Sequence, residues 1–82
     1  MRIDQLRHFL EIAQCHSLSQ ASENLLIGKS TLSSSIRALE DELRSPLFLR
    51  TAKGTFLTSF GENILPFAEE MLTSYNKIEA AK

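Results

Sequence analysis

A regular stripe of apolar residues near the middle of the chain constrains the fold most. Its members recur at spacings of four, three and four residues: Leu32, Ile36, Leu39 and Leu43. Because an α-helix has about 3.6 residues per turn, this spacing places all four on one side of a helix. Pro46 cannot continue such a helix. We therefore predict a helix over residues 29–44 whose apolar face must be covered by other elements.

Two shorter amphipathic segments precede this helix. Asp4 is the expected N-cap of the first, which runs to about residue 14. Ser19 is the expected N-cap of a second, short helix, in which the small Ala21 allows close packing against a neighbouring helix. Gly28 interrupts this helix and permits a sharp turn into the third. The segments together predict a helix-turn-helix.

The pattern changes after Pro46. Residues 47–50 and 55–57 are rich in aliphatic and aromatic side chains, and Gly54 can supply the positive φ of a tight connection between them. Because a two-stranded hairpin is only marginally stable alone, we expect it to pack on the helices. The sequence thus predicts a mostly α fold, a winged helix-turn-helix over residues 1–57 with a two-stranded wing.

A long final helix is expected over residues 58–82, beginning at the N-cap Thr58. Its apolar residues alternate at spacings of four and three, which is typical of a coiled-coil seam: Ile64, Ala68, Met71, Tyr75 and Ile78. A helix of about 22 residues is about 33 Å long and overhangs so small a body. We expect it to be a linker helix whose stripe pairs with a second copy, although the stripe could instead cover the chain's own core.

The side of the 29–44 helix opposite the apolar stripe carries Ser30, Thr31, Ser33, Ser34 and Arg37. Short hydroxyl side chains let a helix enter a DNA major groove about 12 Å wide, and they can bond phosphates or base edges. Arg37 either contacts a phosphate or only caps and solubilises the helix. The hairpin adds Arg50 and Lys53, placed where a wing would touch the DNA backbone or the minor groove.

The charge distribution gives limited support to nucleic-acid binding. The chain has a net charge of −1, whereas nucleic-acid-binding proteins are usually basic. Residues 27–60 contain five basic and three acidic residues, and residues 61–82 contain two basic and four acidic residues. The middle of the chain could therefore face DNA, while the final helix could not.

Other functions find little support in the residue types. The single cysteine, Cys15, excludes an internal disulfide, and His8 and His16 are too isolated for a metal site. Neither a signal peptide nor a membrane-spanning segment is apparent, so we expect a cytoplasmic protein without membrane contact. We identify no catalytic residue and expect no cofactor. A protein-interaction module is the main alternative, because the acidic net charge modestly favours it.

The whole chain resembles the N-terminal DNA-binding domain of LysR-type transcriptional regulators. Several short motifs carry the resemblance in order and without gaps: Leu6-x-x-Phe9, Ser17-Leu18-Ser19-x-Ala21-Ser22-x-x-Leu25, Leu32-Ser33-x-x-Ile36-x-x-Leu39-Glu40-x-x-Leu43, Pro46-Leu47-Phe48-x-Arg50 and Leu57-Thr58-x-x-Gly61. The resemblance implies a bacterial transcription factor that binds double-stranded promoter DNA as a homodimer through its linker helix. It also implies a small-molecule effector only through an effector-binding domain that this chain lacks, which suggests a fragment of a longer protein.

The resemblance further implies which residues contact DNA: Lys29, Ser30, Thr31, Ser33 and Ser34 on the helix, and Lys53 in the wing. Two departures affect base preference. The family commonly has Ser-Gln-Pro where this chain has Gly28-Lys29-Ser30, and it commonly has Arg where this chain has Ser34. We therefore expect this chain to dock on DNA with the geometry of the family, but we infer no operator sequence from the resemblance.

Overall fold

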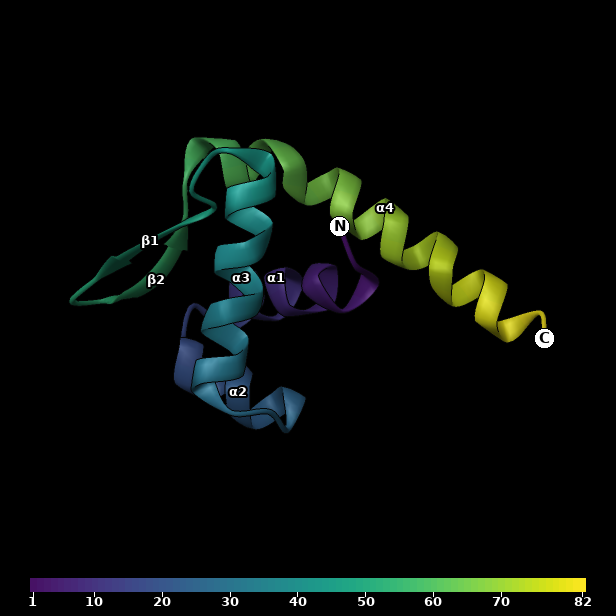
Figure 1. Ribbon diagram of the computed structural model, residues 1–82, viewed down its shortest axis with the longest axis horizontal. Helices are drawn as coiled ribbons and strands as arrows, with labels where there is room; N and C mark the ends of the chain where they lie inside the picture. Colours follow the sequence, from purple (N-terminus) through teal and green to yellow (C-terminus); the bar gives the residue numbers. More distant parts are fainter.

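The computed structural model describes residues 1–82 and confirms the mostly helical architecture with one hairpin. The elements are α1 (Ile3–Cys15), α2 (Leu18–Leu25), α3 (Lys29–Leu43), β1 (Phe48–Thr51), β2 (Gly54–Leu57) and α4 (Ser59–Ala80). Figure 1 shows α1, α2 and α3 as a body from which the hairpin projects to one side and α4 to the other. The molecule therefore measures 43 Å along its longest axis and only 19 Å along its shortest.

The core lies where α1 meets the other elements. Its largest fully buried side chains are Phe9, Ile12, Leu32, Leu39 and Leu47. The apolar stripe predicted for α3 faces this core, with three of its members buried and Leu43 partly buried. Because α1 contacts α2, α3, α4 and β2, it fixes how α3 and the hairpin are held relative to each other.

Both predicted caps at the beginning of the chain were wrong by two residues. Helix α1 begins at Ile3, before Asp4, and the Gln5 side chain accepts a hydrogen bond from the Arg2 N–H at 2.8 Å. Helix α2 is capped by Ser17, whose hydroxyl accepts from the Gln20 N–H at 3.1 Å, and Ser19 lies inside the helix. Both helices thus begin earlier than predicted, α1 after Arg2 and α2 after Ser17.

The turn between α2 and α3 is made by Leu26 rather than by Gly28. Leu26 adopts the left-handed conformation with φ 58°, while Gly28 has φ −70° and is the N-cap of α3. The Ser22 hydroxyl donates to the Ile27 carbonyl at 2.7 Å and holds the turn against α2. Ala21 is fully buried, as expected for a close helix crossing.

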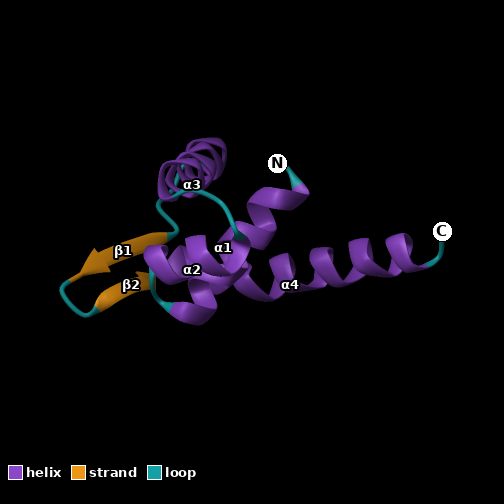
Figure 2. Ribbon diagram, turned by 90° about the horizontal axis from the view of Figure 1, so that it is seen from below, coloured by secondary structure: helices purple, strands orange, loops and turns teal.

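The hairpin pairs β1 with β2 antiparallel, in the register Phe48↔Leu57, Leu49↔Phe56, Arg50↔Thr55 and Thr51↔Gly54. Gly54 has φ 136°, so the predicted positive φ is confirmed. Figure 2, which views the molecule from below, shows the hairpin beside α3, with α3 seen nearly end-on. The wing and α3 can therefore approach one partner together.

Helix α4 begins at the predicted cap, since the Thr58 hydroxyl accepts from the Gly61 N–H at 3.0 Å. It continues through Pro66 to Ala80. Its beginning packs on the body, where Gly61 and Ala68 are buried, and its last residues are exposed (Figure 1). None of the helices combines the length and apolar character needed to cross a membrane.

Candidate nucleic-acid interface

Helix α3 presents a polar face opposite the core. Ser33 is partly buried, and the other candidate residues on this helix are exposed: Lys29, Ser30, Thr31, Ser34 and Arg37. Because Leu32, Ile36 and Leu39 are held in the core, the helix cannot rotate this face away from solvent. The structure therefore brings the six predicted residues of α3 together on one helix surface.

The beginning of α3 is favourable for an anionic partner. Its N-cap, Gly28, has no side chain to accept from the first turn. Exposed N–H groups at a helix N-terminus carry partial positive charge and bond phosphate oxygens. The Lys29 ammonium donates to the Ser19 hydroxyl at 3.0 Å, which ties α3 to α2. Sequence reasoning missed this contact because it placed Ser19 at a helix cap.

The wing places Arg50 beside α3. Its guanidinium lies 3.5 Å from the Ser33 hydroxyl, and both side chains line a notch of about 100 Å³ that also includes Arg37 and Glu40. The Glu40 carboxylate accepts from the Leu47 N–H at 2.6 Å, so it is engaged in holding the wing. Lys53 is exposed at the hairpin turn, away from this notch. The structure thus groups Arg37 with Arg50 and leaves Lys53 at the tip.

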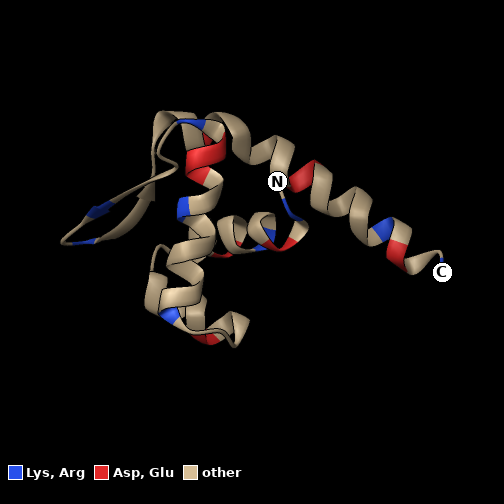
Figure 3. Ribbon diagram, in the orientation of Figure 1, with Lys and Arg blue, Asp and Glu red and all other residues tan.

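The two halves of α3 differ in charge. Figure 3 shows acidic residues gathered near the C-terminal end of α3 and basic residues near its beginning and on the wing. Among the acidic residues, Glu42 pairs with the N-terminal ammonium of Met1 at 2.9 Å. A polyanion would therefore be attracted to the beginning of α3 and to the wing rather than to the end of α3.

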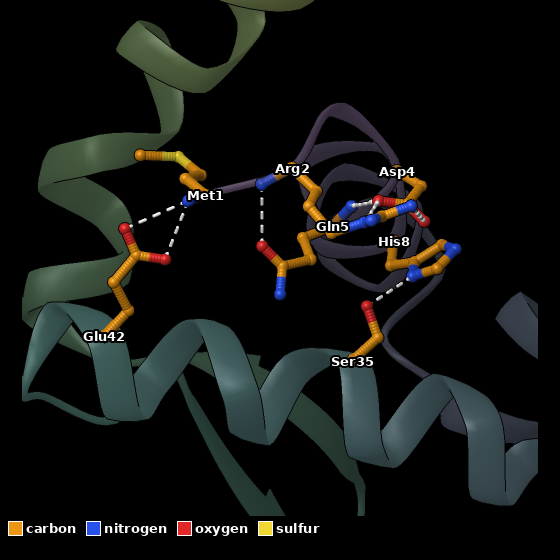
Figure 4. Close-up of polar contacts among 7 residues, drawn as sticks. All are labelled: Met1, Arg2, Asp4, Gln5, His8, Ser35 and Glu42. Atoms are coloured by element: carbon orange, nitrogen blue, oxygen red, sulfur yellow. Dashed lines mark hydrogen bonds and ion pairs between the residues drawn. The ribbon is translucent and has the colours of Figure 1, made fainter.

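Contacts from the N-terminal segment hold α3 in place (Figure 4). Besides the Met1–Glu42 pair, Nδ1 of His8 lies 2.6 Å from the Ser35 hydroxyl. Burial against α3 lowers the pKa of His8, which favours the neutral ring. A neutral ring nitrogen can share a proton with a hydroxyl group. Sequence reasoning missed this α1–α3 contact because the two residues lie 27 positions apart in the chain.

The predicted seam of α4 is divided in the structure. Ile64 and Ala68 pack against the chain's own core, whereas Met71 and Ile78 are 46% and 67% exposed. Tyr75 is half-buried, and the Arg7 guanidinium lies over its ring at 5.3 Å from the ring centre. Phe67, which broadens the predicted seam four residues before Met71, is 63% exposed.

An apolar groove continues this exposed surface towards the body. It has a volume of about 170 Å³, and its lining is entirely hydrophobic: Met1, Leu6, Leu39, Leu43, Ile64, Phe67, Ala68 and Met71. Large apolar surfaces that remain exposed on a small domain commonly mark an interface.

Comparison with known proteins identifies the family. Residues 3–62 match the model of the bacterial regulatory helix-turn-helix proteins of the lysR family. The chain belongs to the LysR family. The resemblance inferred from the sequence is therefore confirmed, as is the helix-turn-helix expected from it. The matched residues include α1, α2, α3 and the wing, and they end near the beginning of α4.

Two curated LysR-family relatives illustrate the similarity. The chain is 38% identical over 80 residues to the HTH-type transcriptional regulator DgdR of Burkholderia cepacia, which covers 98% of this chain and 27% of DgdR. It is 40% identical over 78 residues to IlvR of Caulobacter vibrioides, which covers 95% of this chain and 26% of IlvR. The chain thus spans about a quarter of the length of these relatives.

Solved structures agree on the fold. The H2O2-bound C206S mutant of Corynebacterium glutamicum OxyR superposes with a TM-score of 0.94 at 32% identity, covering 98% of this chain and 26% of that one. A BenM DNA-binding domain in complex with catB site 1 DNA superposes with a TM-score of 0.92 at 26% identity, covering 99% of this chain and 91% of that one. The winged helix-turn-helix followed by a long helix is therefore shared with LysR-family structures.

Proposed function

We propose that this chain binds double-stranded promoter DNA as a homodimer, with the beginning of α3 in the major groove and the wing on the backbone or minor groove. The observation that carries the proposal is the exposed face of α3, which holds hydroxyl and basic side chains and no acidic residue between Lys29 and Leu39. The BenM structure is a DNA complex of a protein with the same fold, which supports this mode of docking.

The residues on this face have distinct proposed roles. Ser30, Thr31 and Ser34 are exposed and short enough to reach base edges or phosphates in the groove. Lys29 and Ser33 already have partners, Ser19 and Arg50, so we propose that they act mainly in positioning and in contacts to the backbone. Arg37, Arg50 and Lys53 would neutralise phosphates, and Lys53 at the hairpin turn reaches farthest from α3.

The homodimer is proposed from the exposed surface of α4. A second copy would cover the exposed residues of the seam, which are Phe67, Met71, Tyr75 and Ile78. Ile64 and Ala68 instead pack into the core of the copy to which they belong. Burying these side chains removes apolar area from water, which stabilises association. Residues 58–82 then act as the linker helix and residues 1–57 as the DNA-binding domain. A small-molecule effector would bind only through a further domain.

The recognition helix can be tested with a matched pair of substitutions. Thr31→Glu places a negative charge against phosphates and base edges, so specific binding should be lost while the fold is kept. Thr73→Glu makes the same chemical change on the hydrophilic face of α4 and should leave DNA affinity unchanged. Binding to a duplex selected from a random library measures both. Retention of full affinity by folded Thr31→Glu would contradict the groove assignment.

A protein-interaction module is the second candidate, because the net charge is −1. A salt titration separates the two functions. As the salt concentration rises, the association constant for mixed-sequence duplex DNA should fall steeply and linearly on a log–log scale, because phosphate contacts release counterions. Absence of measurable DNA binding at low salt would favour the protein-interaction alternative.

A further inference from the structure

The outer part of the wing extends beyond the contacts that hold its base. At the base, Phe48 and Leu57 face each other across the hairpin and pack against the core, and the Phe48 ring centre lies 5.5 Å from that of Phe9. Arg50 and Lys53 lie farther out, towards the turn. A two-stranded hairpin is only marginally stable by itself. The orientation of Arg50 and Lys53 therefore depends on contacts made by the outer part of the wing.

His16 supplies contacts of this kind. Its carbonyl accepts a hydrogen bond from the Thr55 N–H at 2.9 Å, at the register position opposite Arg50. Its ring stacks on the ring of Phe56, with centres 5.0 Å apart and planes inclined by 27°. A Cβ atom at Gly54 would lie only 2.7 Å from the His16 carbonyl oxygen, so glycine leaves room for this approach. Three consecutive residues of β2 therefore meet His16.

The position of His16 is itself well fixed. It ends α1 in the left-handed conformation with φ 57°, and its N–H donates to the Ile12 carbonyl at 2.8 Å. Helix α1 is joined to α3 by the core and by the His8–Ser35 hydrogen bond. The orientation of the outer wing is thus related to that of α3 through α1 and His16.

We infer that His16 is a positioning residue for DNA binding. It holds the outer wing relative to α3, so that Arg50 and Lys53 meet DNA while the beginning of α3 lies in the groove. This inference rests on the proposed function, because it requires the wing to contact DNA. The role is divided between the carbonyl, which any residue provides, and the imidazole ring, which substitution removes.

The test removes the ring and keeps the backbone. His16→Asn retains a residue type that tolerates the left-handed conformation and retains the carbonyl. An aromatic pair contributes about 0.5–1.5 kcal/mol, so affinity for a duplex selected by the unmodified chain should fall roughly two- to tenfold. Phe56→Ala should have a similar effect from an exposed hairpin position, and it provides a second route if His16→Asn does not fold. Phe56→Tyr keeps the ring and should bind as the unmodified chain does.

A double-mutant cycle shows whether His16 acts through the wing. In a chain that also carries Arg50→Ala and Lys53→Ala, His16→Asn should cause little further loss, because the contacts it positions are already absent. An equal loss in both backgrounds would overturn the inference, since His16 would then act on the whole domain. Full affinity of His16→Asn or Phe56→Ala, when Lys53→Ala alone weakens binding, would overturn the inference and leave the proposed function intact. Full affinity of the Arg50→Ala/Lys53→Ala chain would show that the wing does not contact DNA. It would overturn both the inference about His16 and the part of the proposed function that places the wing on DNA.

Discussion

The apolar stripe of α3 in the body and the apolar stripe of α4 share their spacing but have different surroundings. The stripe of α3 and the stripe of α4 both recur at spacings of four and three residues. In the body, Leu32 and Leu39 are completely buried, whereas Met71 and Ile78 on α4 remain 46% and 67% exposed. Helical spacing therefore identifies an apolar face but does not identify what covers it.

This difference separates two tasks. The body covers its own apolar residues and can hold the polar face of α3 towards a partner. The outer half of α4 has apolar residues that the same chain does not cover, so its proposed task is to pair two copies. Substitutions in the two regions should consequently affect different measurements.

Among the substitutions that compare the buried and the exposed stripe, the largest effect on DNA binding should come from the outer half of α4. Met71→Asp would bury an unpaired charge in the proposed seam, which is costly enough to split a small interface. The variant should sediment as a monomer and keep its helical signal. Its affinity for a duplex with two half-sites should fall by roughly a hundredfold or more. The reason is that the affinity of two linked binding domains exceeds that of a single domain by a factor of about 10²–10⁴. Thr73→Asp, on the hydrophilic face of the same helix, is the control and should remain dimeric.

A substitution in the body should reduce stability instead. Leu39→Ala removes a fully buried side chain from the centre of the α3 stripe and should lower the free energy of unfolding by about 2–5 kcal/mol. Urea denaturation followed by circular dichroism measures this loss. Ile78→Ala, at a 67% exposed position of α4, should change the stability of the monomeric Met71→Asp chain far less. Equal losses at the two positions would remove the distinction between the regions.

Much of the body could be predicted because its signals are local. The stripe of α3 and the cap at Thr58 each depend on residues within a few positions, and both are confirmed. The predictions for Asp4 and Ser19 were wrong because α1 begins before Asp4, after Arg2, and because Ser17 lies two residues before Ser19 and caps α2 instead. Gly28 was expected to make the turn, but Leu26 takes the left-handed conformation there.

The exposed polar face of α3 was predictable from the sequence, but the contacts that position it were not. The exposed face of α3 follows directly from the position of its apolar stripe. The contacts Lys29–Ser19, His8–Ser35 and His16–Thr55 join residues that lie 10 to 39 positions apart, and no local pattern encodes such pairs. The division of the α4 stripe into a buried and an exposed part could also be seen only in the folded structure, because it depends on where the body ends.

A smaller effect is expected at the wing, and it sharpens the account of the DNA-binding surface. Lys53→Ala should weaken binding to all duplexes about equally and reduce the log–log salt slope by up to roughly one unit, as one lost phosphate contact would. Titrations with selected and mixed-sequence duplexes measure both quantities. A loss confined to the selected duplex would place Lys53 on base edges in the minor groove instead.

The smallest effect should come from the end of α3. Arg44 ends this helix in the left-handed conformation with φ 59° and is exposed. Because glycine adopts this conformation without the strain that a Cβ atom causes, Arg44→Gly should raise the free energy of unfolding by up to about 1 kcal/mol. DNA affinity should be unchanged, since Arg44 lies at the end of α3 opposite the proposed contacts. Chemical denaturation of the unmodified chain and of Arg44→Gly measures whether the free energy of unfolding rises or falls.

The central claim is that two copies, paired through α4, place two α3 helices on one duplex. Hydroxyl-radical footprinting on a duplex selected from a random library tests it most directly. The unmodified chain should protect two stretches related by a two-fold axis, and Thr31→Glu should protect neither. A single protected stretch at saturation, or unchanged protection by folded Thr31→Glu, would contradict the claim.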